Sequence, residues 1–139
     1  MPEVLGASND KLELVLPAAP PSVAAARHAL TAYAERCGWT DLWPIQTAVS
    51  EAVGNAVVHA YPRSRNGSQV WISAELDRDG LLVAVEDEGT GMRPRVDSPG
   101  LGLGISLIER LTDRLVMEDR SQGGLRVELR FDRELHEAG

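Results

Sequence analysis

A segment of alternating apolar and polar residues, followed after a short turn by a second strand-like segment, constrains the fold of this chain most strongly. Residues 70–76 place an apolar side chain at every second position, and residues 81–86 form a second strand-like segment. A period of two is typical of a β-strand that buries one face. The intervening Asp77-Arg78-Asp79-Gly80 has the composition of a hairpin turn. The chain is therefore predicted to contain an antiparallel sheet with one buried face.

Helical periodicity precedes this hairpin. A first helix is predicted from Ser22, whose hydroxyl is expected to cap it, to Gly38, and a second from about Thr40–Asp41 to Pro62. The expected apolar faces comprise Val23, Arg27, Leu30, Ala34 and Cys37 in the first helix, and Ile45, Val49, Ala52, Val53, Ala56 and Ala60 in the second. The other expected elements are a strand at 11–16, a helix with Leu103, Leu107, Ile108 and Leu111 on one face, and strands at 115–117 and 125–131.

This order of elements predicts the α+β class. Helices that lie together on one face of a mixed, mostly antiparallel sheet form a two-layer sandwich, in which each layer covers the apolar face of the other. A chain of 139 residues is about the size of one domain. A single domain over residues 1–139 is therefore expected, with its core at about 11–132.

The charge balance limits the classes of partner. Fourteen basic residues against twenty-one acidic ones give a net charge of −7, which disfavours binding to nucleic acid or to an anionic membrane, since phosphate binding relies on clustered cations. The single Cys37 permits no intrachain disulfide, and no cysteine and histidine residues have zinc-ligand spacing. No apolar run of membrane-spanning length and no signal-peptide pattern occurs in the sequence. A cytoplasmic location is therefore expected.

The lysine content excludes two common kinds of nucleotide site. Thirteen of the fourteen basic residues are arginine, and the one lysine is Lys11, at the start of the first predicted strand. A P-loop requires lysine inside its glycine motif, and a eukaryotic-type protein kinase requires it on a strand after a glycine-rich loop. No glycine loop adjoins Lys11, so nucleotide chemistry in this chain needs another structural plan.

A carboxylate and a carboxamide share one face of the second predicted helix. Glu51 and Asn55 are four residues apart, which places them on the same side of a helix. Their oxygen atoms suit a hydrated magnesium ion or the orientation of a hydroxyl group. Taken alone, this spacing is explained better by a solvated polar stripe.

An acidic residue ends the second strand of the hairpin on its apolar side. Strand parity places Asp87 with Val83 and Val85 on the inward face. A buried carboxylate needs a partner, and the exocyclic amine of adenine is a suitable one, while Gly89 and Gly91 would allow the backbone to approach a flat ring. The alternative is a turn, in which Asp87 caps the loop that follows.

Residues 99–105 carry glycine at alternate positions and lead into a helix. Gly100, Gly102 and Gly104 expose backbone N–H groups, and the start of the helix adds positive potential, so the segment suits a polyphosphate. It is not a dinucleotide fingerprint, because no strand leads into it and Ile105 stands in the place of the third glycine. A flexible linker before a helix is the alternative.

The three motifs in this order resemble one known architecture. E-x-x-x-N on a helix, D-x-G-x-G after a strand and G-x-G-x-G before a helix are similar to the GHKL (Bergerat) ATP-binding fold shared by DNA gyrase and histidine kinases. The resemblance spans residues 12–131, and within that superfamily the chain most resembles small bacterial anti-sigma factor serine kinases. Residues 50–61 look like their helix motif, and the short segment between Gly91 and Gly100 looks like their abbreviated nucleotide lid.

The resemblance implies a role for each matching residue. Asn55 would coordinate the Mg²⁺ that bridges the ATP phosphates, Glu51 would be the general base for a serine hydroxyl, and Asp87 would accept a hydrogen bond from the adenine amine. The base pocket would include Gly89, Gly91 and Met92, the phosphates would be enclosed by Gly100, Leu101, Gly102, Leu103 and Gly104, and the γ-phosphate would be reached by Arg93 and Arg95. Solvent exposure explains the two arginines equally well. Leu125 departs from the pattern, because these kinases often carry a threonine there that contacts the base through water.

The implied function is that of an anti-sigma factor that is also a serine-protein kinase. Such a protein binds ATP and Mg²⁺, sequesters a sigma factor and phosphorylates a STAS-type anti-sigma factor antagonist on serine. The resemblance further suggests a homodimer, with no direct contact to nucleic acid or membrane. Two alternatives remain open: a non-catalytic ATP-binding interaction module of the same fold, and a kinase that acts on a STAS-type scaffold without binding a sigma factor.

Overall fold

The computed structural model describes residues 3–4, 11–60, 68–89 and 102–133. Its strands form a six-stranded sheet in the order β1-β2-β3-β4-β6-β5, and every described pair of neighbouring strands is antiparallel. The predicted sheet was mixed and mostly antiparallel, whereas the described pairs include no parallel one. The strands are β1 (Glu3–Val4), β2 (Lys11–Pro17), β3 (Gln69–Asp77), β4 (Gly80–Asp87), β5 (Arg114–Asp119) and β6 (Leu125–Asp132).

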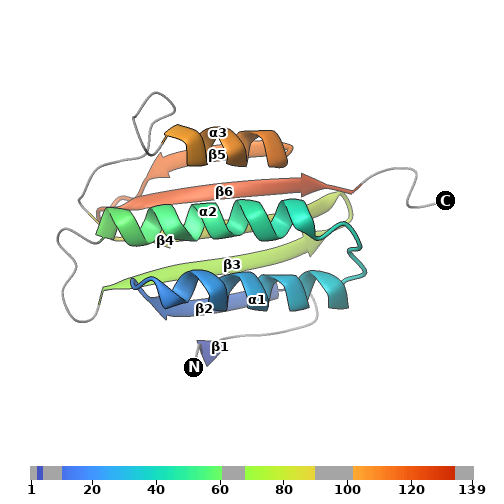
Figure 1. Cartoon of the computed structure of the whole chain (residues 1–139), viewed down its shortest axis with the longest axis horizontal. Helices are drawn as coiled ribbons and strands as arrows, with labels where there is room; N and C mark the ends of the chain where they lie inside the picture. Colours follow the sequence, from blue (N-terminus) through green and yellow to red (C-terminus); the bar gives the residue numbers. More distant parts are fainter. Residues whose placement is uncertain (1–2, 5–10, 61–67, 90–101, 134–139) are drawn as a thin grey trace.

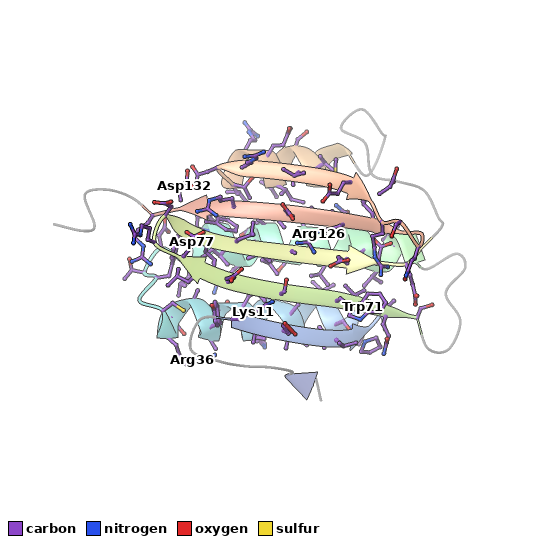
Figure 2. The ribbon with its side chains drawn as sticks, turned by 180° about the vertical axis from the view of Figure 1, so that it is seen from behind. Lys11, Arg36, Trp71, Asp77, Arg126 and Asp132 are labelled. Atoms are coloured by element: carbon purple, nitrogen blue, oxygen red, sulfur yellow. The ribbon has the colours of Figure 1, made fainter. Side chains whose placement is uncertain are left out.

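The helices lie together on one face of this sheet (Figure 1). They are α1 (Pro21–Arg36), α2 (Trp43–Ala60) and α3 (Gly102–Leu111). Helix α2 runs over the middle of the sheet and packs against β4, while α1 packs against β2 and α3 against β5. No described helix covers the opposite face, where strand side chains such as Lys11, Trp71 and Arg126 lie (Figure 2). The predicted α+β two-layer sandwich is thus confirmed.

The core lies between the helices and the sheet. The inward-facing side chains of the strands, at every second position, form the sheet side of this core. In β2 the side chains of Leu12, Leu14 and Leu16 are buried, whereas their neighbours are half-buried or exposed. The helices contribute a continuous apolar face from α2, of which Ile45 and Val49 are fully buried. Burying apolar surface between the layers supplies the main driving force for this arrangement.

Helix α1 differs from its prediction at the N-terminus. Pro20 is its N-cap residue and no side chain caps the helix, while Ser22 is buried and its hydroxyl donates a hydrogen bond to the carbonyl oxygen of Pro17. The buried face comprises Ser22, Ala26, Leu30, Tyr33 and Ala34. Arg27, predicted on that face, is half-buried and donates a hydrogen bond to Ser50 on α2 (3.3 Å). Leu30 and Ala34 are thus buried as predicted, and Val23 and Cys37 are half-buried against the core, whereas the burial of Ser22, Ala26 and Tyr33 was not predicted.

The end of α1 and the hairpin of β3 and β4 are as predicted. Gly38 has a φ of +88° and follows the C-cap residue of α1, where its N–H donates to Glu35 O and that of Trp39 donates to Ala34 O. This pattern ends a helix at a glycine. The hairpin turns between Asp77 and Gly80.

Two later elements begin earlier than predicted. Helix α3 begins at Gly102, so its first turn includes glycines expected in the preceding loop. Among its described side chains, those of Ile105 and Ile108 are buried, while those of Leu107 and Leu111 are half-buried. Strand β5 extends over Arg114–Asp119 rather than 115–117. Within the described residues, no helix combines the length and the apolar character that crossing a bilayer requires.

Candidate functional site

Helix α2 carries the first two candidate residues. Asn55 is half-buried, and its Nδ2 atom is shielded from solvent with no hydrogen-bond partner in the described part of the protein. Glu51 lies one turn earlier on the same helix and is half-buried. Residues four apart lie on the same face of a helix, so the carboxylate and the carboxamide are neighbours, as predicted. A shielded amide nitrogen without a partner is costly in a folded protein and calls for an explanation.

Strand β4 places the third candidate residue. Asp87 is its last residue and pairs in register with Val70 of β3 and with Leu125 of β6. Only 2% of its surface is exposed, which confirms the inward orientation predicted from strand parity. Leu125 is also buried, so the position beside Asp87 on the neighbouring strand is apolar. A carboxylate buried in these surroundings requires hydrogen-bond donors.

The alternative interpretation of Asp87, a turn residue, is also supported. Its Oδ1 atom accepts a hydrogen bond from the N–H of Gly89 at 2.9 Å, the usual contact of an aspartate turn. Asp77 forms the same kind of turn with the N–H groups of Asp79 and Gly80 while it is exposed to solvent. Turn formation therefore needs no burial, and it does not account for the position of Asp87 inside the protein.

Asn55 and Asp87 line the same small hollow between α2, β4 and α3. Its other lining residues are Ala52, Ala56, Val85, Ile105, Ile108 and Val127. The hollow has a volume of about 10 Å³, far less than a nucleotide occupies. The described residues thus supply one wall of a candidate site: a carboxylate and a carboxamide on an otherwise apolar surface, next to the first turns of α3. Such a wall suits a flat, partly apolar ring that carries hydrogen-bond donors.

The remaining predicted site residues are described only in part. Gly89 is half-buried and close to Asp87 through the turn contact. Gly91, Met92, Arg93, Arg95, Gly100 and Leu101 lie outside the described residues. Gly102, Leu103 and Gly104 form the first turn of α3, where the backbone N–H groups have no partner within the helix. The phosphate-binding role of this segment stays a prediction.

A larger hollow lies elsewhere, on the open face of the sheet. It measures about 530 Å³ and is lined by side chains such as Trp71, Glu86, Arg120 and Arg126, but by neither Asn55 nor Asp87. Its two arginines are already ion-paired, since Arg120 and Arg126 both contact Glu86, at 3.2 and 2.6 Å. We therefore place the candidate site at the smaller hollow, where buried polar groups converge.

The sequence analysis missed one residue next to this site. Arg120 donates a hydrogen bond to the backbone carbonyl oxygen of Asp87 at 2.9 Å, although the two residues are far apart in the sequence. Its guanidinium also lies 4.9 Å from the ring centroid of Trp71, which is half-buried. No local pattern around residue 120 indicates these contacts.

The side chains near the hollow limit how the predicted Mg²⁺ could be bound. Among the described residues, no group of three or more His, Cys, Asp or Glu side chains could hold a metal ion by itself. Asn55 offers a single carboxamide beside the hollow, which suits a metal held mainly by the phosphates of a nucleotide and by water. Mg²⁺ is usually bound in this way, so the residues present fit the ATP and Mg²⁺ implied by the sequence resemblance.

Comparison with known proteins identifies the family. Residues 16–131 match the family model described as histidine kinase-like ATPase domain. An anti-sigma F factor of Clostridium beijerinckii is 29% identical to this chain over 133 residues, which cover 86% of this chain and 92% of that protein. The serine-protein kinase RsbW of Bacillus subtilis is 34% identical over 129 residues, covering 81% and 80%, and that of Listeria innocua is 33% identical over 122 residues, covering 76% and 77%. The chain therefore belongs to the histidine kinase-like ATPase domain family, a membership that implies ATP binding.

Proposed function

We propose that this protein is an ATP-dependent serine-protein kinase that also acts as an anti-sigma factor. The observation that carries the proposal is the convergence of a buried carboxylate, Asp87, with the carboxamide of Asn55 in one hollow beside the start of α3. The names of the related proteins, anti-sigma F factor and serine-protein kinase RsbW, support the same conclusion.

The nucleotide is bound in this proposal by groups from three elements. Asp87 accepts a hydrogen bond from the 6-amino group of adenine, and Gly89, Gly91 and Met92 line the base. Asn55 would hold Mg²⁺ through its carboxamide oxygen, while its shielded Nδ2 atom, a donor without a partner among the described residues, would donate to an acceptor on the bound nucleotide. The segment Gly100, Leu101, Gly102, Leu103 and Gly104 surrounds the phosphates with N–H groups at the N-terminus of α3, and Arg93 and Arg95 approach the γ-phosphate.

Glu51 carries the proton transfer. ATP with Mg²⁺ supplies an activated γ-phosphoryl group and neutralises charge on the phosphates. The serine Oγ of the substrate protein forms a bond to the γ-phosphorus, the bond between that phosphorus and the β,γ-bridging oxygen breaks, and ADP leaves. The Glu51 carboxylate takes the proton of the serine hydroxyl. Its place one turn from Asn55 puts the base beside the metal ligand.

The partners in this proposal are proteins. One is a sigma factor, which the protein sequesters, and the other is a STAS-type anti-sigma factor antagonist, which it phosphorylates on serine. The net charge of −7 favours basic protein surfaces over nucleic acid or anionic membrane. The proposal includes a homodimer as the active assembly.

Phosphoryl transfer to a STAS-type antagonist tests the kinase assignment. The full chain is incubated with γ-labelled ATP, Mg²⁺ and the antagonist, in parallel with Glu51→Gln and, as a matched control, Glu35→Gln, which alters an exposed glutamate of α1. Serine labelling is expected in the wild type and the control, and a loss of about 100-fold or more in Glu51→Gln, with ATP binding retained. ATP binding without any transfer by the wild type would contradict the kinase and favour a binding module. Failure to co-purify with a sigma factor, despite transfer, would favour the scaffold kinase.

A further inference from the structure

Arg120 lies directly after β5 and connects three parts of the sheet. Its Nε atom is 3.2 Å from Oε1 of Glu86 in β4, and its guanidinium lies 4.9 Å from the ring centroid of Trp71 in β3. One of its terminal nitrogens donates hydrogen bonds to the carbonyl oxygens of Asp87 (2.9 Å) and Gly123 (3.3 Å). A single side chain on the open face thus joins β3, the end of β4 and the turn between β5 and β6.

The turn between β5 and β6 packs closely on the backbone of Asp87. Gly124 has a φ of +97°, and a Cβ atom at this position would overlap with the carbonyl oxygen of Asp87 and with the Cα of Glu88. The N–H of Arg120 donates to the carbonyl oxygen of Gly124 at 3.0 Å. The turn therefore holds Arg120 at the place from which its guanidinium reaches the Asp87 carbonyl.

The backbone carbonyl and the side-chain carboxylate of Asp87 have contacts on opposite faces of the sheet. Its carbonyl oxygen is bound by a side chain of the open face, while its carboxylate lies at the hollow shared with Asn55 under the helices. Asp87 is also the last residue of β4, so strand pairing restrains its backbone less after this point than before it. Hydrogen bonds weaken steeply with distance and angle, so a small rotation of this backbone changes what the carboxylate can recognise.

We propose that Arg120 is a positioning residue that sets the base selectivity of the nucleotide site. By holding the Asp87 carbonyl from the open face, it fixes the direction of the Asp87 carboxylate toward a 6-amino purine. This inference rests on the proposed function, since it takes the nucleotide base as the ligand of Asp87.

Arg126 provides a matched control on the same face. It contacts Glu86 at 2.6 Å and Glu128 at 2.9 Å, and among its described contacts none reaches the backbone of Asp87. Arg120 and Arg126 share Glu86 and are both partly exposed, with 21% and 31% of the side chain accessible. Partly exposed ion pairs contribute little to stability, so removing either guanidinium is expected to preserve the fold. Only the removal of Arg120 also releases the Asp87 carbonyl.

The ratio of the affinities for two nucleotides distinguishes positioning of the Asp87 carboxylate by Arg120 from a general effect of Arg120 on stability. Calorimetric titrations of the full chain compare ATP with purine riboside triphosphate, which lacks only the 6-amino group. The wild type is expected to prefer ATP by about tenfold or more, the range of one hydrogen bond to a charged group. Arg120→Met is expected to reduce this preference by about threefold or more, and Arg126→Met to leave it unchanged. Circular dichroism verifies that each variant is folded.

The outcomes distinguish this inference from the proposed function. If the wild type shows no preference, base recognition by Asp87 is wrong and both fail. If the wild type prefers ATP and Arg120→Met keeps the full preference, Arg120 is not a positioning residue, although the proposed function stands. An equal loss in both variants also overturns the inference. If Arg120→Met does not fold, Arg120→Lys decides: a preference between those of the wild type and of Asp87→Asn supports positioning, and an unchanged one contradicts it.

Discussion

Two aspartates of this protein make the same local turn contact but differ in burial. Asp77 and Asp87 each accept a hydrogen bond from the N–H two residues later, at 2.8 and 2.9 Å. Asp77 is exposed, whereas Asp87 is buried beside Asn55. The turn motif is therefore sufficient to explain Asp77 and insufficient for Asp87. The proposed binding role of Asp87 therefore rests on its burial, and not on its residue type or its turn contact.

The lowered pKa of Asp77 predicts that the free energy of unfolding depends on pH in the acidic range. The hydrogen bond from Arg130, and then that from the N–H of Asp79, lowers the pKa of Asp77 from 3.8 to about 2. A pKa lowered by folding gives a stabilisation that is present above the unfolded value and is lost as the pH falls toward the folded one. We expect the urea midpoint of the wild type to fall between pH 4 and pH 2, and that of Asp77→Asn to fall less. The effect is small because Asp77 is exposed, and parallel curves would contradict it.

At the scale of elements, helix α2 contains a glycine that its local structure does not require. Gly54 lies in the interior of the helix, and a Cβ atom there would meet nothing within 4 Å. Alanine favours a helix over glycine by about 0.8–1 kcal/mol. We expect Gly54→Ala to raise the free energy of unfolding by about 0.5–1 kcal/mol in urea denaturation. A decrease would mean that the backbone of α2 needs glycine at this point.

The turn between β5 and β6 requires its second glycine for two reasons. Gly123 and Gly124 have similar φ values, +99° and +97°, but a Cβ atom on Gly123 would meet nothing within 4 Å, whereas one on Gly124 would overlap with the Asp87 carbonyl. We expect Gly123→Ala to lower the free energy of unfolding by about 1–2 kcal/mol through backbone strain. Gly124→Ala should lower it by roughly 2–5 kcal/mol, because steric overlap is added. Equal losses in denaturant titrations would show that the turn does not press on Asp87.

The elements themselves were largely predictable from local patterns. Alternation predicted β3 and β6, the hairpin turn before residue 81 predicted β4, and strand parity predicted the burial of Asp87. The face of α1 was predicted only in part: Leu30 and Ala34 are buried, but Ser22 bonds to Pro17 and is buried rather than capping the helix. Whether a serine caps a helix or anchors it depends on the path of the preceding chain, which periodicity does not contain.

At the scale of the whole molecule, the order β1-β2-β3-β4-β6-β5 brings the candidate site together. Because β6 pairs with β4, the turn before β6 reaches the end of β4, and α3 comes to lie beside α2. Figure 1 shows this juxtaposition of α2, α3 and the central strands. Motif order predicted that Asn55 and Asp87 belong to one site, whereas the contact of Arg120 with Asp87 depends on this topology and could not be predicted from local sequence.

The central claim is that Asp87, buried at the end of β4, recognises a nucleotide base next to Asn55. Calorimetric titration with ATP and Mg²⁺ tests it most directly, with Asp87→Asn compared against the wild type and against Glu88→Gln, which removes an exposed negative charge from the adjacent residue. We predict that Asp87→Asn weakens ATP binding by about tenfold or more, whereas Glu88→Gln leaves it unchanged or slightly stronger. Superimposable titrations for the wild type and Asp87→Asn would contradict the claim.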